Sequence, residues 1–353
     1  MSPLISPGSL IAPVPAPSGE RKEPLPSRLL DRFGRVHTNL RISITDRCNF
    51  RCTYCMPEEM EFYPKEQILS YEEIVRLARI AGGLGVDKIR LTGGEPLVRR
   101  DVTRLVRALS ELGTLRDLSL TTNGARLEEM AEELWDAGLR RINVSLDSLD
   151  PSKFTEITRR PLFNAVMRGL EAAARVGFDP IKVNAVAVKG FTEPELLAFA
   201  ELAREKRYQV RFIEFMPLDG DGAWDHAKVL TQEEILDVIR GRYPLERATP
   251  PGSSDPATIF RFTDGRGDIG VIPTVTEPFC GACNRIRLTA DGKLRHCLFA
   301  VRETDLKTPL RSGASDEELA WGFVDCVREK WAGHLINQTG FEKPRRNMSQ
   351  IGG

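Results

Sequence analysis

LRISITDRCNFRCTYC, at residues 40–55, joins an alternating strand directly to a run of closely spaced cysteines. In its first six residues apolar side chains alternate with polar ones, which is the pattern of a strand with one apolar and one polar face. Cys48, Cys52 and Cys55 follow in the next loop. Parallel α/β folds build their sites in the loops at the carboxyl ends of their strands. The stretch therefore predicts a parallel fold and the position of its site.

The same strand pattern recurs along the chain, and amphipathic helical stretches separate the repeats. The strand-like stretches are residues 40–45, 87–92, 117–121, 141–147, 180–186 and 210–215, and the helical ones lie near 71–84, 101–112, 127–137, 163–176 and 193–206. This alternation predicts a parallel sheet with right-handed crossovers. A doubly wound sheet needs strands that are apolar on both faces, whereas all of these but the last, whose phase is ambiguous, keep one polar face. We therefore expect an α/β fold, an incomplete (β/α)6 TIM-like barrel whose polar interior holds a ligand.

Composition divides the chain into four parts. Residues 1–28 are rich in proline, serine and glycine and predict a disordered arm, residues 29–216 form the partial barrel, residues 217–340 carry a second group of cysteines in a smaller, separate region, and residues 341–353 form a tail. In the third part short strands are expected near 257–262, 269–272, 284–289 and 293–296, and helices at 231–240, 303–311 and 316–330. The tail has no apolar period, so its composition alone predicts flexibility.

The charge balance argues against several partners. Lys and Arg total 50, as do Asp and Glu, so the formal net charge is zero and gives no general attraction to nucleic acid or to an anionic membrane. No apolar run approaches the roughly 18 residues that a membrane span needs. Prolines interrupt the N-terminal stretch where a secretory signal would have its apolar region. Together with the grouped thiols, these features predict a cytoplasmic location. An organelle is the alternative if the N-terminal arm is a cleaved transit segment, although the arm is not an Arg-rich amphipathic helix.

Six of the seven cysteines fall into two groups of three, Cys48, Cys52 and Cys55 in the first and Cys280, Cys283 and Cys297 in the second. An odd total without a secretory signal argues against a disulfide framework and for metal binding. The seventh, Cys326, fits a buried apolar position. Three thiolates can hold a 4Fe–4S cluster and leave one iron open for a substrate. A structural zinc ion is the alternative for each group, with a distant fourth ligand for the first and His296 for the second.

Five cations are predicted to point into the barrel interior. They are Arg41, Arg90 and Lys182 on the polar faces of barrel strands, and Arg285 and Arg287 on one face of a strand beside the second cysteine group. Buried cations require anionic partners, and the fork of an arginine suits a phosphate. The polyphosphate of a nucleotide would satisfy all five. The alternative for each is a side chain that reaches the surface along its aliphatic stem.

These motifs resemble a known superfamily. CxxxCxxC at residues 48–55 is the signature of the radical S-adenosylmethionine (SAM) superfamily, and TGGEP at 92–96 resembles its glycine-rich turn, which contacts the methionine of SAM. TTNG, SLDSL, FIEFMP, FCGACNRIRLTADGKLRHCL and the terminal Gly352-Gly353 extend the likeness to the GTP 3′,8-cyclase family, which acts first in molybdenum cofactor biosynthesis. The resemblance runs from about residue 31 to the last residue.

The resemblance implies a role for each matching position. The implied SAM-cluster ligands are Cys48, Cys52 and Cys55, the auxiliary-cluster ligands Cys280, Cys283 and Cys297, the SAM contacts Tyr54, Gly94, Ser145 and Met216, and the GTP contacts Arg41, Arg90, Thr121, Lys182, Arg285, Ile286 and Arg287. Catalytic roles are implied for Arg41, Arg285, Arg287, Gly352 and Gly353. In this family the Gly-Gly end reaches into the active site. The implied cofactors are two 4Fe–4S clusters and SAM.

The implied reaction is a radical cyclisation of GTP. A 5′-deoxyadenosyl radical, released when a reduced cluster splits SAM, would take hydrogen from C3′ of GTP, and the ribose radical would add to C8 to give (8S)-3′,8-cyclo-7,8-dihydroguanosine 5′-triphosphate. The implied partners are a one-electron reductant, a downstream cyclic pyranopterin monophosphate synthase and, as one option, a second copy of the chain in a homodimer. Two other functions stay open, a peptide-modifying radical SAM enzyme with an auxiliary cluster and a non-catalytic iron–sulfur protein.

Overall fold

The first part of the chain alternates strands and helices as the sequence predicts. The computed structural model describes residues 23–218, 222, 224–250 and 254–352. The strands are β1 (Asn39–Ser43), β2 (Lys88–Thr92), β3 (Asp117–Thr122), β4 (Arg141–Ser145), β5 (Ile181–Ala187) and β6 (Gln209–Glu214). The helices are α1 (Tyr71–Gly83), α2 (Val102–Ser110), α3 (Leu127–Asp136), α4 (Pro151–Thr158), α5 (Phe163–Val176) and α6 (Leu196–Lys206). Of these, only the short α4 was not expected.

Shorter elements follow in the C-terminal part. The strands are β7 (Leu245–Arg247), β8 (Thr258–Phe262), β9 (Asp268–Ile272), β10 (Arg285–Leu288), β11 (Lys293–Arg295) and β12 (Thr304–Asp305). The helices are α7 (Gln232–Arg240), α8 (Lys307–Arg311), α9 (Asp316–Arg328) and α10 (Met348–Ile351), and the 3-10 helices are η1 (Lys65–Gln67), η2 (Pro96–Val98), η3 (Glu193–Glu195), η4 (His226–Lys228) and η5 (Phe279–Ala282). β7, of three residues, was not expected from the sequence. The helix expected at 303–311 begins only at Lys307, because Thr304 and Asp305 form the strand β12.

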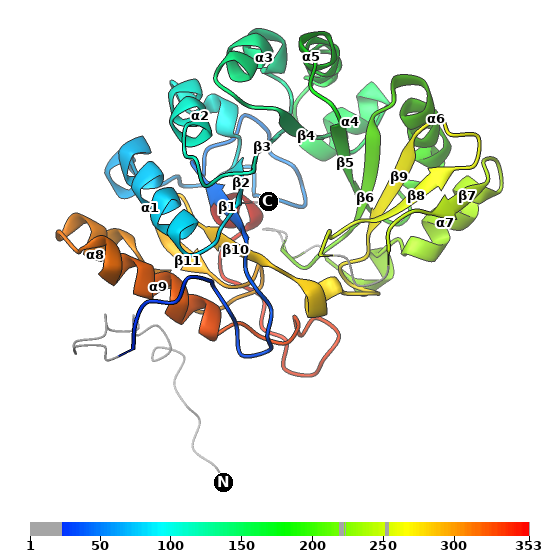
Figure 1. The fold of residues 1–353 in the computed structure, drawn as a ribbon. Coiled ribbons are helices and arrows are strands. Elements are labelled where there is room, and N and C mark those ends of the chain that lie inside the picture. Colours follow the sequence, from blue (N-terminus) through cyan, green and yellow to red (C-terminus); the bar gives the residue numbers. More distant parts are fainter. Residues whose placement is uncertain (1–22, 219–221, 223, 251–253, 353) are drawn as a thin grey trace.

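All of these strands belong to one curved sheet, with the order β12-β11-β10-β1-β2-β3-β4-β5-β6-β9-β8-β7. From β10 to β9 neighbouring strands are parallel, and the four outer strands join antiparallel. Figure 1 shows the helices α1, α2, α3, α5 and α6 along the outer face and the turn α10 inside, near β1. The architecture confirms the expected incomplete barrel. The strands after residue 216 are not a separate layer, because they extend this same sheet at both ends.

Register decides which side chains enter the interior. Leu40 and Ile42 of β1 are fully buried in the core beneath the helices, so Arg41 between them faces inward. Arg41 lies opposite Arg90 of β2 on one side and opposite Arg287 of β10 on the other. Residues paired in this way share one face of the sheet. The pairing therefore brings three guanidinium groups together on the inner wall.

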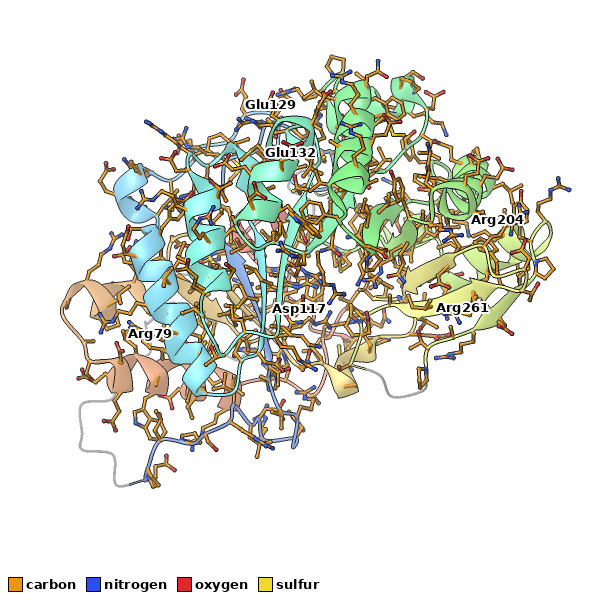
Figure 2. The ribbon with its side chains drawn as sticks, turned by 45° about the horizontal axis from the view of Figure 1, so that its top comes forward. Arg79, Asp117, Glu129, Glu132, Arg204 and Arg261 are labelled. Carbon is orange, nitrogen blue, oxygen red and sulfur yellow. The ribbon has the colours of Figure 1, made fainter. Side chains whose placement is uncertain are left out.

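Helix α1 begins at a capping box, and the outer helices carry charged side chains on their exposed faces. At the start of α1 the Ser70 Oγ accepts from the N–H of Glu73 at 3.2 Å, and the Glu73 carboxylate accepts from the N–H of Ser70 at 2.7 Å. Such a capping box stabilises a helix by about 1 kcal/mol. Figure 2 shows Arg79 of α1 and Glu129 and Glu132 of α3 pointing away from the sheet. These helices therefore present their apolar faces to the core and their charged faces outward.

The expected disordered arm lies mostly outside the described residues. Residues 1–22 belong to that undescribed part, whereas Glu23 forms an ion pair of 2.9 Å with Arg328 of α9, and Leu29 is buried. None of the helices in the described residues is long and apolar enough to cross a membrane.

Candidate active site

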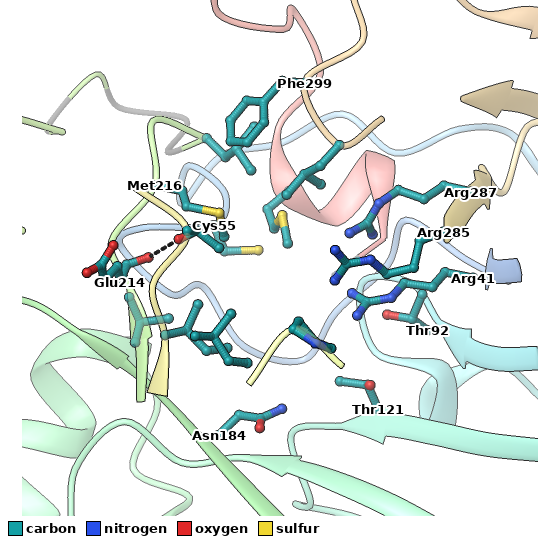
Figure 3. Close-up of a pocket in the computed structure, with 18 of the residues that line it drawn as sticks. Arg41, Cys55, Thr92, Thr121, Asn184, Glu214, Met216, Arg285, Arg287 and Phe299 are labelled. Carbon is teal, nitrogen blue, oxygen red and sulfur yellow. Dashed lines mark hydrogen bonds between the residues drawn. The ribbon is translucent and has the colours of Figure 1, made fainter. Parts of the chain in front are cut away.

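One pocket gathers both cysteine groups at the carboxyl ends of the barrel strands (Figure 3). Its lining includes Cys48, Cys52, Cys55, Cys280, Cys283 and Cys297. Each of these is half-buried and none is in a disulfide. Figure 3 shows Arg41, Arg285 and Arg287 side by side, facing Cys55 and Met216 across the pocket. Motifs from opposite ends of the chain thus meet in a single cavity.

Two glycines bring the turn after β2 against the first cysteine loop. The N–H of Gly94 donates to the carbonyl oxygen of Thr45 at 2.7 Å. A Cβ on Gly94 would lie 2.4 Å from the carbonyl oxygen of Arg47, and one on Gly93 would lie 2.5 Å from that of Thr45. Backbones this close leave no room for a side chain. The TGGEP turn is therefore locked to the segment that leads into Cys48.

Glu95 of the same turn bonds to the end of β3, and through Asn123 this contact reaches the first cysteine loop. Its carboxylate accepts from the N–H of Asn123 at 2.6 Å and from the Oγ1 of Thr122 at 2.7 Å. Burial outweighs these bonds and raises the pKa of Glu95 to about 7. Asn123 in turn donates from Nδ2 to the Sγ of Cys48 at 3.8 Å. The ends of β2 and β3 thus hold the first thiol in place.

The other predicted SAM contacts, Tyr54, Ser145 and Met216, line the same pocket, and Tyr54 is held by a hydrogen bond. Its hydroxyl donates to the Oδ2 of Asp147 at 2.6 Å, and the Oδ1 of Asp147 accepts from the N–H of Val186 at 2.8 Å. Burial raises the pKa of Asp147 to about 6. Asp147 therefore orients Tyr54 from the neighbouring strand ends.

Crowded cations dominate the electrostatics of the pocket. Burial, and then the charges of Arg287, Arg90 and Arg285, hold the pKa of Arg41 well below its usual range. Burial and the nearby Arg285 lower the pKa of Arg287 to about 9, and burial and Arg211 lower that of Arg90 to about 10. Within the described residues the buried Nε of Arg41 has no hydrogen-bond partner. This arrangement is costly until an anion enters the pocket.

Two further cations secure the second cysteine loop. Arg35 donates from Nη1 to the carbonyl oxygen of Cys280 at 2.7 Å, and Lys330 donates from Nζ to that of Arg285 at 2.7 Å. Arg285 also donates from Nη2 to the Sγ of Cys283 at 3.3 Å. Burial raises the pKa of Cys283, but the charges of Arg285 and Lys330 more than offset it and bring it to about 6. Cys283 is thus predisposed to the thiolate form that binds metal.

The chemistry of the thiols fits the two expected clusters. Burial above all, with repulsion among the thiols and from Asp147, raises the pKa of both Cys52 and Cys55. A bound cationic iron centre would relieve that repulsion. The N–H of Phe50 donates to the Sγ of Cys48 at 3.3 Å, a bond that suits a thiolate ligand. Across the ranges described above, no three His, Cys, Asp or Glu side chains are arranged to hold a single metal ion.

Three other predicted GTP contacts differ in their placement. Thr121 lines the pocket. Lys182 is buried on β5 and shares the inner face of the sheet with the pocket-lining Asn184. It lies two residues before Asn184, towards the amino end of the strand and away from the pocket. The side chain of Ile286 belongs to the hydrophobic core, because it alternates with the inward-facing Arg285 and Arg287. A contact between Ile286 and a bound nucleotide would therefore have to come from its backbone.

The end of the tail lies against the inner wall. Gly352 is buried, and its carbonyl oxygen accepts a hydrogen bond from Arg287. Met348, at the start of α10, lines the pocket. Composition alone predicted a flexible tail, whereas the structure gives it a helical turn and internal contacts. Gly353, the other predicted catalytic glycine, is outside the described residues.

Sequence reasoning missed Arg211. This side chain is buried and lines the pocket beside Asn184, with which it pairs in register across β5 and β6. The alternation of Arg211 with Val210 and Phe212 was a usable signal. The apolar Ile213, which also faces the pocket, obscured the phase of this strand. The cluster of cations is thus larger than the sequence suggested.

Comparison with known proteins defines the class of this fold and site. Residues 42–203 match the family described as Radical SAM superfamily, and residues 208–336 match the one described as Molybdenum Cofactor Synthesis C. Among solved structures, Streptococcus suis SuiB bound to S-adenosylmethionine matches with a TM-score of 0.58 at 15 % identity, over 90 % of this chain and 78 % of that one. At this identity the likeness concerns the fold alone. The protein has the fold of a radical SAM protein, with the cysteine motif of that class.

Sequence relatives narrow the class to one family. GTP 3′,8-cyclase of Rhodopirellula baltica is 50 % identical over 336 residues, covering 93 % of this chain and 93 % of that protein. The Moorella thermoacetica protein of the same name is 48 % identical over 92 % of this chain and 99 % of its own length. The mitochondrial GTP 3′,8-cyclase of Arabidopsis thaliana is 43 % identical over 94 % of this chain and 85 % of its own. The chain belongs to the GTP 3′,8-cyclase family.

Proposed function

We propose that the protein is a radical SAM lyase that converts GTP to (8S)-3′,8-cyclo-7,8-dihydroguanosine 5′-triphosphate, the first step of molybdenum cofactor biosynthesis. The observation that carries the proposal is the single pocket whose lining contains both cysteine triples and a cluster of arginines. The names of its relatives support the same reaction. Its cofactors are two 4Fe–4S clusters and SAM.

The wall around the first cysteine group is suited to SAM. Cys48, Cys52 and Cys55 would hold the cluster that would supply the electron for splitting the SAM sulfonium. Tyr54, oriented by Asp147, and the backbone near Gly94, Ser145 and Met216 would hold SAM in position. The contribution of these residues is orientation and exclusion of water, since the cofactor performs the difficult chemistry.

The opposite wall is suited to GTP. Arg41, Arg90, Arg285 and Arg287 would bind the triphosphate, together with Thr121, Lys182 and the additional Arg211. An anion there would relieve the repulsion that lowers the pKa of these arginines. Cys280, Cys283 and Cys297 would hold the auxiliary cluster beside the guanine. The nucleotide would thus be held at both its base and its phosphates, leaving the ribose between the walls.

The proposed setting is a reducing compartment, the cytoplasm, because all seven cysteines are free. The reaction requires a one-electron reductant, and its product would pass to a cyclic pyranopterin monophosphate synthase. A homodimer is part of this proposal as one option for the assembly.

Anaerobic reconstitution with iron and sulfide, followed by assays with and without GTP, tests the function. We expect 5′-deoxyadenosine together with a cyclised product that appears only when GTP is present. Release of 5′-deoxyadenosine without any GTP-derived product would favour a peptide-modifying enzyme. A protein that carries both clusters but releases no 5′-deoxyadenosine would be a non-catalytic iron–sulfur protein.

A further inference from the structure

Arg346 bonds the tail to the barrel. Its guanidinium donates from Nη1 and Nη2 to the two carboxylate oxygens of Asp291, at 3.0 and 2.9 Å. It also donates to the Oε2 of Glu303 at 2.8 Å and to the hydroxyl of Tyr63 at 2.9 Å. The side chain of Arg346 is 15 % exposed, and that of Asp291 is 9 % exposed. Bidentate, largely buried bonds of this kind are the strong class of ion pair.

The three partners of Arg346 come from separate segments of the chain, and Glu303 directly precedes β12. Asp291 lies in the turn between β10 and β11, where it accepts from the Oγ1 of Thr289 at 2.6 Å. Tyr63 follows the first cysteine loop, and its N–H donates to the Oδ2 of Asp46 at 2.7 Å. Arg346 therefore joins the wall that carries the second cysteine group to the loop that carries the first.

The residues after Arg346 make contacts that depend on where it is held. The side chain of Asn347 caps α10 by accepting from the N–H of Gln350 at 3.3 Å. The Oγ of Ser349 donates to the Sδ of Met60, five residues after Cys55, at 3.6 Å, and the carbonyl oxygen of Gly352 accepts from Arg287. Helix α10 is a stiff turn of only four residues. The position of its first residue therefore determines the position of Gly352, which follows its last residue. The anchor thus determines the depth that the tail reaches.

We propose that Arg346 is a positioning residue, which sets how far the end of the tail, described as far as Gly352, inserts between the first cysteine loop and the proposed GTP-binding arginines. The inference rests on the proposed function, because the depth of insertion matters for turnover only if the end of the tail takes part in cyclisation. The competing explanation is a purely structural bond that stabilises Asp291 and Glu303. The neighbouring Arg345 is exposed and provides a control with the same change of charge.

Hydrogen exchange followed by mass spectrometry tests the anchor without relying on activity. In the reconstituted holoenzyme, Arg346→Ala is expected to speed amide exchange in residues 347–352 at least about tenfold, the scale of one lost charged hydrogen bond. In this variant amide exchange in the barrel strands should stay as in the parent protein. In the control Arg345→Ala amide exchange should be unchanged in the whole chain. Tyr63→Phe, which removes one bond only, gives a smaller increase and serves if Arg346→Ala does not fold. Unchanged exchange of the tail in Arg346→Ala, or in Tyr63→Phe in that case, would overturn the proposal.

Kinetics in two backgrounds separate positioning from stability. Arg346→Ala is expected to lower kcat for cyclisation with little change in the KM for GTP. Arg346→Lys is expected to retain part of the kcat that Arg346→Ala loses. In a chain that lacks Gly352 and Gly353 the same substitution should cause no further loss, because there is no end left to position. An additional loss of equal size there would overturn the proposal. If removal of the two glycines alone leaves turnover intact, the proposed role of the tail in cyclisation is refuted. Hydrogen exchange then still tests whether Arg346 holds the tail in place.

Discussion

The guanidinium of Arg287 donates a hydrogen bond to the backbone carbonyl oxygen of Gly352, 65 positions later in the chain. Gly352 adopts a φ of +88°, and a Cβ there would lie 2.9 Å from the Cβ of Ser43. Glycine alone tolerates both that φ and so close an approach. One of the proposed GTP-binding arginines is therefore bonded to the end of the tail.

Removing Gly352 and Gly353 is expected to slow cyclisation strongly while GTP affinity, iron content and the unfolding midpoint change little. The tail end would organise catalysis and not the core. Product formation under anaerobic conditions, with equilibrium binding of GTP, checks this. The variant Gly352→Ala tests the same position by substitution. Gly340→Ala is its matched control, because Gly340 also has a positive φ but has open space around it. Full turnover after truncation would contradict the prediction.

The two cysteine groups are expected to divide the work. Cys48→Ala should abolish SAM cleavage, whereas Cys297→Ala should retain some cleavage and lose the cyclised product. The reason is that the two cysteines belong to different triples in the lining of one pocket. Release of 5′-deoxyadenosine and formation of the GTP product are measured in parallel, and Cys326→Ala, a buried thiol of the core, is the control. Equal loss of cleavage in both variants would refute separate roles.

Arg41→Ala or Arg287→Ala is expected to weaken GTP binding by about 1.5–3 kcal/mol, the scale of a charged hydrogen bond. Both side chains face the pocket in Figure 3. Arg79→Ala removes the same charge from the exposed side of α1 and should leave affinity unchanged. Anaerobic calorimetry provides the measurement. Identical affinities for all three variants and the parent would mean that the two arginines do not face the nucleotide.

GTP binding is expected to be accompanied by proton uptake at Lys182. Burial, and then the charges of Arg211 and Arg141, lower the pKa of this amine to about 7. At pH 8 the empty protein therefore holds Lys182 mostly neutral, and a bound triphosphate would raise its pKa towards the ordinary value. Calorimetry in two buffers of different ionisation enthalpy should report uptake of up to about one proton. Lys182→Arg, which stays charged, should bind without this uptake, and the same uptake in that variant would exclude Lys182 as its source.

Acid is expected to destabilise the fold through His37. Burial, and then the charge of Lys330, lower the pKa of His37 from 6.5 to about 4. The unfolded chain therefore binds a proton that the folded chain does not, so this contribution to stability is complete above pH 6.5 and is lost as the pH falls towards 4. At pH 5.5 the loss is about 1 kcal/mol. Urea unfolding of the cluster-free chain at pH 7.5 and 5.5 measures it. His37→Phe should reduce the difference, and an unchanged difference would contradict the prediction.

The fold could be predicted as far as local patterns reach. Alternation within β1 to β5 identified both the strands and their inward faces, because each pattern is contained in a few residues. The pairing of β10 with β1 could not be predicted, since no local signal specifies a partner so far along the chain. The same limit applies to Arg346, whose partners come from three separate segments. The sequence therefore predicted the functional side chains that lie near motifs. It did not predict those that act through tertiary contacts.

The position of β10 also has a consequence for the order in which the molecule matures. Asn284, which leads into this strand, bonds to Thr38 across 246 positions of the chain. At about 5–20 residues per second, a ribosome takes roughly 10–50 s to cover that distance. During this time the edge of β1 has its backbone groups exposed to any other strand. The chamber that would shelter a reactive radical exists only once that late strand has arrived.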